Sequence, residues 1–134
     1  MKQLSDILYK VPITAITGTT DIAVSSVQID SRKVQKGTLF IAVKGTAVDG
    51  HQFMAKAIEQ GAVAVVCEAL PAVLNDNITY VQTANSALAA GILAHNFFDQ
   101  PSTKYKLVGV TGTNGKTTIA TLLYKLFTSL GYDC

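Results

Sequence analysis

Tryptophan is absent from this sequence, and aromatic residues make up only 7% of its 134 residues. So few aromatic side chains leave little surface on which nucleic-acid bases could stack. The charge balance is equally unsuited to a polyanion, because 11 basic and 9 acidic residues leave a net charge of only +2. A nucleic-acid-binding face is normally strongly basic. The composition therefore predicts no nucleic-acid partner.

Cysteine is also scarce: Cys67 lies within an apolar run and Cys134 at the last position. Two unpatterned cysteines favour reduced thiols in the cytoplasm over a disulfide framework, and no Cys or His spacing typical of a metal site occurs. No apolar run is long enough to span a bilayer, and the first residues lack the apolar region of a signal peptide. We expect a cytoplasmic monomer without integral membrane contact.

Apolar residues account for 49% of the chain, which is enough for a hydrophobic core. Short β-branched runs alternate with segments of helical periodicity. The expected strands are 14–17, 26–29, 38–43, 62–67 and 78–81, and the expected helices are 3–9, 50–60 and 85–98. This order predicts a small layered α/β domain over residues 1–100.

The most informative segment runs from Gly109 to Thr118 and reads Gly-Val-Thr-Gly-Thr-Asn-Gly-Lys-Thr-Thr. It lies between an apolar run at 105–110, expected to be a strand, and a helical pattern at 119–130. Glycines let backbone N–H groups converge on an anion, and a helix N-terminus adds partial positive charge. The usual template G-x-x-x-x-G-K-[ST] is met except at its first glycine, where Val110 stands. The alternative is a strand-helix turn that needs glycine only for positive φ. Gly-Lys-Thr between a strand and a helix is too specific for that alternative, so the segment predicts a nucleotide phosphate-binding loop.

In such a loop, Lys116 would contact the β- and γ-phosphates of ATP as the catalytic cation, and the Thr117 hydroxyl would be a ligand of Mg²⁺. The predicted ATP-binding residues are Gly112, Thr113, Asn114, Gly115, Lys116, Thr117 and Thr118. We expect residues 101–134 to be a linker followed by the truncated start of an ATP-binding domain. The only carboxylate after Lys116 is Asp133, so this chain alone is not expected to turn over ATP.

Outside the loop, the segment Asp30-Ser31-Arg32 follows the expected strand 26–29. Loops at strand ends of α/β domains gather ligands. Ser31 could hydrogen-bond a ligand, and Arg32 could bind a phosphate or carboxylate bidentately. From spacing alone, an Asx-type turn with a solvated Arg32 is the favoured explanation of these residues. His51 is interpreted as a polar residue of a first helical turn, and His95 as a packed or boundary residue.

Several motifs, taken in order, resemble the N-terminal part of a Mur ligase. They are Asp30-Ser-Arg32, Gly37-Thr-Leu-Phe-Ile-Ala-Val-Lys-Gly45, Asp49-Gly-His-Gln-Phe53, Gly61-Ala62 and the run from Val108 to Thr118. Mur ligases are the ATP-dependent amide-forming enzymes of peptidoglycan precursor synthesis. The linker and the run into the loop, residues 97–113, are most similar to the branch that adds the third residue of the stem peptide.

The resemblance implies that residues 1–100 bind the UDP part of the substrate and that the following domain binds ATP and Mg²⁺. Carried over by motif, the residues that would contact the UDP moiety are Ile29, Ser31, Thr46, Ala47 and Val48. The family often has polar side chains where Ala47 and Val48 stand, so their contact would be through backbone or packing. The implied reaction adds a diamino acid, meso-diaminopimelate in preference to L-lysine, to UDP-N-acetylmuramoyl-L-alanyl-D-glutamate through an acyl phosphate.

Other proteins share parts of this pattern. The nearest alternative is the related ligase that adds D-alanyl-D-alanine, which has a similar Asp-Ser/Thr-Arg domain. Folylpolyglutamate synthetase resembles the ATP loop but lacks the N-terminal domain. A non-catalytic UDP-sugar-binding module would fit residues 1–100, and a general phosphotransferase or GTPase would carry the loop near its N-terminus. The version of the loop in residues 112–118 favours the ligase that adds the third residue.

Overall fold

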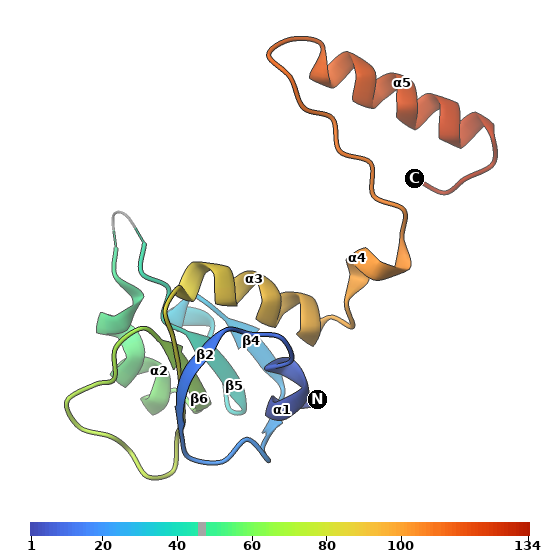
Figure 1. Ribbon diagram of the computed structural model, residues 1–134. Coiled ribbons are helices and arrows are strands. Elements are labelled where there is room, and N and C mark those ends of the chain that lie inside the picture. Colours follow the sequence, from blue (N-terminus) through green and yellow to red (C-terminus); the bar gives the residue numbers. More distant parts are fainter. Residues whose placement is uncertain (46–47) are drawn as a thin grey trace. The chain divides into compact units, whose positions relative to one another are not determined.

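The computed structural model describes residues 1–45 and 48–134, and its contacts divide the chain into two units, Met1–Pro101 and Ser102–Cys134 (Figure 1). Unit 1 is built on a five-stranded sheet with the strand order β2-β7-β6-β5-β4. Its parallel strands are β4 (Ser26–Gln28), β5 (Thr38–Ile41), β6 (Ala62–Cys67) and β7 (Thr79–Thr83). Strand β2 (Ile13–Thr17) runs antiparallel to β7, and β1 (Lys2–Gln3) pairs separately with β3 (Ala23–Val24). The mixed α/β fold predicted for this part of the chain is confirmed.

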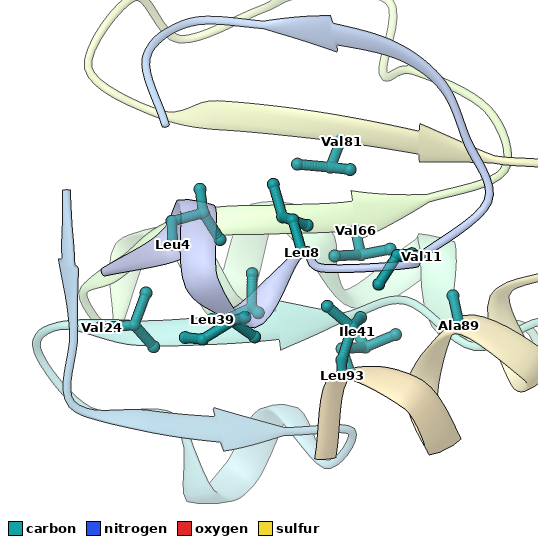
Figure 2. Packing of buried hydrophobic residues seen from close by; sticks show 12 residues of the cluster. Leu4, Leu8, Val11, Val24, Leu39, Ile41, Val66, Val81, Ala89 and Leu93 are labelled. Atoms are coloured by element: carbon teal, nitrogen blue, oxygen red, sulfur yellow. The ribbon is translucent and has the colours of Figure 1, made fainter. Parts of the chain in front are cut away.

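Helices cover both faces of the sheet, because successive side chains of a strand point to opposite faces. On one face, a cluster that includes Leu39, Ile41 and Val66 packs against α1 (Leu4–Ile7) and α3 (Ser86–Phe97), as Figure 2 shows. On the other face, Phe40 and Val65 belong to a second cluster with residues of α2 (Met54–Glu59). Every residue of β5 is buried as a result. Burial on both faces explains why the parallel strands are near-continuous hydrophobic runs in the sequence.

Helix α3 is fixed at both ends by asparagine side chains. At its start, the side chain of Asn85 accepts the backbone N–H of Leu88 at 2.9 Å. Asn85 is thus the N-cap of α3, and it is the first residue of the predicted helix 85–98. Near its end, the buried amide of Asn96 donates to the carbonyls of Ile7 at 2.9 Å and Tyr9 at 2.7 Å. Backbone carbonyls that would lack a partner after α1 are thereby satisfied. The last helix of unit 1 is therefore joined to the first.

The helix predicted for residues 50–60 is confirmed, although its first turn is the 3-10 helix η2 (Gly50–Phe53), which leads into α2. Gly61 ends it with a φ of 104°, as predicted for a helix stop. A Cβ there would lie 2.9 Å from the Cα of Lys36. Both the backbone angle and the crowding therefore require glycine at this turn.

Unit 2 contains α5 (Lys116–Ser129), and the four-residue helix α4 (Pro101–Lys104) precedes it across the division between the units. The helix predicted for residues 119–130 is confirmed, but it starts three residues earlier, at Lys116. The strand predicted for residues 105–110 is wrong for this structure: no strand forms among the described residues of unit 2, since a strand needs a neighbour with which to pair. The apolar side chains of Leu122, Leu126 and Leu130 on α5 are exposed.

Within residues 1–45 and 48–134, no helix combines the length and the apolar character needed to cross a membrane.

Candidate functional site

The segment after β4 forms a capped turn at the carboxyl end of the strand. Asp30 is the N-cap of the 3-10 helix η1 (Ser31–Lys33), and its carboxylate accepts the backbone N–H of Arg32 at 3.0 Å. The same carboxylate accepts Nε and Nη2 of Arg32 at 2.9 and 2.8 Å. The bonds from the guanidinium, followed by the backbone bond, lower the pKa of Asp30 to about 2. The Asx-type turn is therefore present, but Arg32 is paired with Asp30 and would have to exchange that partner to bind a ligand bidentately.

The residues predicted to contact a UDP moiety follow two neighbouring parallel strands, β4 and β5. Ser31 is buried in η1, whereas Ile29 and Val48 are 64% and 55% exposed. Because β4 and β5 pair in parallel, their carboxyl ends meet at the same edge of the sheet. Thr46 and Ala47 lie outside the described residues. The assignment of these five residues to UDP binding stays a prediction.

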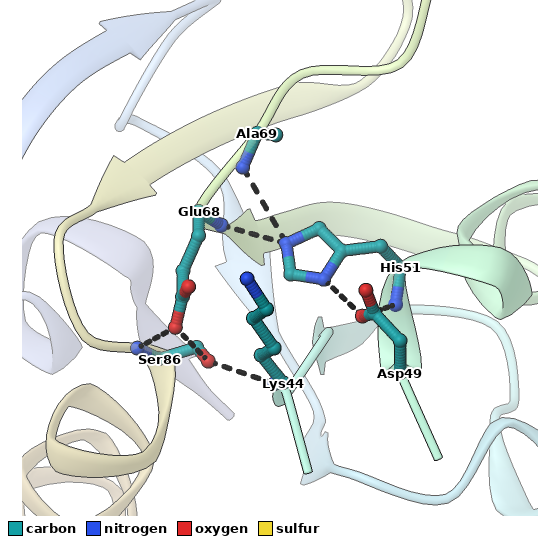
Figure 3. A network of polar contacts seen from close by, with 6 residues as sticks. All are labelled: Lys44, Asp49, His51, Glu68, Ala69 and Ser86. Carbon is teal, nitrogen blue, oxygen red and sulfur yellow. Dashed lines mark hydrogen bonds and ion pairs between the residues drawn. The ribbon is translucent and has the colours of Figure 1, made fainter. Parts of the chain in front are cut away.

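His51 joins two segments at this same edge, as Figure 3 shows. Its Nδ1 lies 2.6 Å from Oδ1 of Asp49, which also accepts the His51 backbone N–H at 3.0 Å. Its Nε2 accepts the backbone N–H of Glu68 at 2.8 Å and that of Ala69 at 3.4 Å, directly after β6. The bonds from the backbone and ring of His51 lower the pKa of Asp49. The side chain of His51, with 14% of its surface exposed, links the start of η2 to the end of β6.

Glu68 continues this network toward α3. Its Oε1 accepts the backbone N–H of Ser86 at 2.9 Å and the Ser86 hydroxyl at 2.7 Å. These two bonds, the backbone one foremost, lower the pKa of Glu68. The Ser86 oxygen in turn accepts the backbone N–H of Lys44 at 3.0 Å. The segments after β5, β6 and β7 are thus connected through side chains, which gives this edge a defined shape.

The sequence interpretation did not single out Lys44, Glu68 or Ser86. One signal was available: Glu68 is a charged residue directly after a buried strand, and Ser86 opens a helix after the next strand. His51 does lie in a first helical turn, as expected, but its ring reaches β6 instead of facing only its own turn.

The predicted phosphate-binding residues 112–118 comprise the turn at 112–115 and the first three residues of α5. Gly112 and Gly115 have φ values of 147° and 76°, in the region that favours glycine. Gly115 is the N-cap of α5 and has no side chain with which to cap the helix. A Cβ at Gly115 would meet nothing within 4 Å, so the backbone angle and not crowding selects glycine there. No side chain caps the first turn of this 14-residue helix, an arrangement that suits an anion at its backbone N–H groups.

The ammonium group of Lys116 is folded over this turn. It donates to the carbonyl of Gly112 and, at 3.2 Å, to that of Thr113. The carbonyl of Thr117 accepts the hydroxyl of Thr121 at 2.8 Å, which is an ordinary bond within a helix. The turn can therefore present backbone N–H groups and one cation to the same anion. The individual roles of residues 112–118 and of Thr117 as a metal ligand stay predictions.

Comparison with known proteins extends these local features to the whole chain. A family model described as the Mur ligase family, catalytic domain, matches residues 23–122. UDP-N-acetylmuramoyl-L-alanyl-D-glutamate--2,6-diaminopimelate ligases from Cytophaga hutchinsonii and Bacteroides fragilis are 54% and 52% identical to this chain. Each alignment covers 97% of this chain and 27% of the relative, so the chain spans about a quarter of the length of these relatives.

Two solved structures of another ligase are similar in fold. MurF from Acinetobacter baumannii gives a TM-score of 0.59 at 28% identity, covering 80% of this chain and 23% of that one. MurF ligase from Thermotoga maritima, solved in complex with ADP, gives a TM-score of 0.56 at 31% identity, covering 78% and 23%. With a family match from β3 into α5 and relatives that share about half of its residues, this chain belongs to the Mur ligase family.

Proposed function

We propose that this chain is part of an ATP-dependent ligase that joins meso-diaminopimelate to UDP-N-acetylmuramoyl-L-alanyl-D-glutamate. The observation that carries the proposal is its 54% identity, over 97% of its length, to a ligase of that name. Because the chain spans about 27% of that relative, the complete activity belongs to a full-length protein. The proposal includes a cytoplasmic monomer with neither a nucleic-acid partner nor integral membrane contact.

Residues 1–100 would bind the UDP moiety of the substrate at the carboxyl edge of the parallel strands. Ligands of open α/β sheets bind outside this edge. The exposed apolar side chains of Ile29 and Val48 offer a surface against which a uracil ring could pack. Ser31 adds a hydroxyl that can donate and accept a hydrogen bond. The proposal extends to Thr46 and Ala47 by motif alone.

Residues 101–134 would contribute the start of an ATP-binding domain, with Gly112 to Thr118 holding ATP and Mg²⁺. The turn fits these groups, since it combines two glycines at positive φ, an uncapped helix N-terminus and the ammonium of Lys116. When bound, ATP would supply the phosphoryl group that converts the free D-glutamate carboxylate to an acyl phosphate. Lys116 would stabilise the negative charge that develops on the γ-phosphoryl group, and Thr117 would hold Mg²⁺ through its hydroxyl. The amine of the diamino acid would then attack the acyl phosphate and displace phosphate.

Two alternatives fit less well. A ligase adding D-alanyl-D-alanine has the same fold, but its solved representatives are 28–31% identical to this chain. Five diaminopimelate ligases are 46–54% identical to it. A non-catalytic UDP-sugar-binding module would have no use for an uncapped glycine-rich turn with a lysine folded over it.

The test has two parts. Calorimetric titration of this chain with UDP-N-acetylmuramoyl-L-alanyl-D-glutamate, UDP and ATP in turn should give saturable binding of the two uridine nucleotides. A full-length protein should then form an amide with meso-diaminopimelate, and not with D-alanyl-D-alanine or L-lysine. Binding of ATP without any uridine nucleotide would contradict the assignment of residues 1–100, and preference for another acceptor would contradict the proposed substrate.

A further inference from the structure

The segment of residues 48–50, which contains the proposed substrate contact Val48, is held at both of its ends. The backbone N–H of Gly45 donates to the carbonyl of Val48 at 3.1 Å, and Lys44 and Asp49 form an antiparallel bridge. The N–H of Gly50 donates to the carbonyl of Val43 at 2.9 Å. All of these bonds return to the segment after β5, which is itself joined to the start of α3 through the Lys44 N–H and the Ser86 oxygen.

Attachment to the neighbouring strand comes from the His51 ring. Its two nitrogens have different partners, the Asp49 carboxylate at Nδ1 and the N–H groups of Glu68 and Ala69 at Nε2. A carboxylate can only accept and a backbone N–H can only donate. The proton of the imidazole must therefore be on Nδ1, and Nε2 must be the acceptor. This is one defined tautomer of a neutral ring, selected by the partners on its two sides.

Each of these partners is itself fixed. Asp49 is the N-cap of η2, and Glu68 is held through its side chain by two bonds from Ser86 at the start of α3. The charged groups around the ring are thus the Asp49 and Glu68 carboxylates, with the Lys44 ammonium interacting with both. The ring is therefore placed between two hydrogen-bonded supports, one on the loop after β5 and one on the end of β6.

We propose that His51, protonated at Nδ1, is a positioning residue that fixes residues 48–50 beside the carboxyl end of β6 for contact with the uridine nucleotide. This inference rests on the proposed function, in which Val48 contacts that nucleotide. His51 touches neither substrate nor ATP in this role and acts through the position of the backbone that follows β5.

Two substitutions separate the two nitrogens of the ring. His51→Gln places an amide oxygen near the position of Nε2, so it keeps an acceptor for Glu68 and loses the donor to Asp49. His51→Asn places its amide near Nδ1, so it keeps the donor to Asp49 and leaves the N–H of Glu68 without its acceptor. His95→Asn, which removes the other histidine of the chain, is the matched control.

Two readouts are needed. Hydrogen exchange at the amides of Glu68 and Ala69, with the nitrogen chemical shifts of His51, reports the anchoring itself without any ligand. The dissociation constant for UDP-N-acetylmuramoyl-L-alanyl-D-glutamate, measured calorimetrically with UDP alone as a second titrant, reports the positioning. We expect His51→Asn to accelerate exchange and to weaken both uridine ligands about tenfold, because a donor loses its partner. His51→Gln should restore most of the affinity, and His95→Asn should leave it unchanged.

The outcomes separate the inference from the function on which it rests. Nitrogen shifts that place the proton on Nε2, or exchange that is unchanged in His51→Asn, would overturn the anchoring. Faster exchange with unchanged affinity would overturn the positioning, and equal losses of affinity in the Gln and Asn variants would reduce His51 to a structural residue. If the unsubstituted chain binds neither uridine ligand, the proposed function fails and the positioning role fails with it, while exchange still decides the anchoring.

Discussion

Ionisation of a buried thiol should weaken unit 1 at high pH. Cys67 is the last residue of β6, has none of its surface exposed, and belongs to the cluster between the sheet and α2. Burial penalises the thiolate and raises the pKa of Cys67 from 9.0 to about 11. The other cysteine of the chain, Cys134, is exposed and serves as the control.

The sign of the effect follows from the proton count. Between pH 9 and pH 11 the unfolded chain loses the Cys67 proton while the folded chain keeps it. Stability falls with pH wherever the folded state binds more protons. The contribution is therefore complete below pH 9 and is lost as the pH rises through about 11, with a total of roughly 2–3 kcal/mol.

Urea unfolding followed by far-ultraviolet circular dichroism at a series of pH values measures this loss. Cys67→Ala should lower the stability at pH 8 by about 1 kcal/mol or more, through the cavity that it leaves, but should lack the additional decline above pH 9. Cys134→Ala should decline like the unsubstituted chain. Parallel pH profiles for Cys67→Ala and the unsubstituted chain would refute the reasoning, because the decline would then come from other groups.

Three further substitutions test the site and the fold. Lys116→Ala in the full-length protein should reduce ligase turnover by at least 100-fold, through lost charge stabilisation, and leave the affinity for the UDP substrate nearly unchanged. Ser31→Ala should raise the KM for the UDP substrate without changing the affinity for ATP. Asn96→Ala should lower the free energy of unfolding of unit 1 by about 2–4 kcal/mol in urea, because the carbonyls of Ile7 and Tyr9 each lose a buried donor.

Each of these has an outcome that would contradict it. Equal loss of turnover and UDP-substrate affinity in Lys116→Ala would mean that the two ligands do not bind to separate parts of the protein. An unchanged KM in Ser31→Ala would remove Ser31 from the site. A loss below about 1 kcal/mol in Asn96→Ala would mean that water replaces the amide at those carbonyls.

The parts of the fold that the sequence predicted well are those decided by local pattern. The strand 62–67 was located to the residue, because Gly61 stops the preceding helix and a continuous apolar run follows. The helix 85–98 differed from α3 by one residue at each end, since Asn85 is an N-cap by residue type. The prediction of a strand at 105–110 is wrong for a non-local reason. β-branched composition favours a strand, but a strand forms only when it pairs with a neighbouring strand.

The site shows the same division. The turn at residues 112–118 could be predicted because its chemistry lies in consecutive residues. The connection of Lys44, His51, Glu68 and Ser86 could not, because these residues are separated along the chain and meet only when β5, β6 and β7 lie in register. Their partners depend on the strand order, which alternating strands and helices do not determine by themselves. The pairing of Arg32 with Asp30 lies between these cases, since the turn was foreseen and the bidentate contact was not.

The contact of Asn96 with the end of α1 sets an order on synthesis. The carbonyls at the end of the first helix find this donor about 90 residues later, so they lack it while the chain emerges until α3 has been made. At the usual ~5–20 residues per second, that delay is roughly 5–20 s. During this time Leu4, Ile7 and Leu8, all buried in the finished unit, lack the part of their cluster that α3 supplies, Ala89 and Leu93. The same pair of hydrogen bonds that closes the unit thus forms only late in synthesis, after α3 has been made.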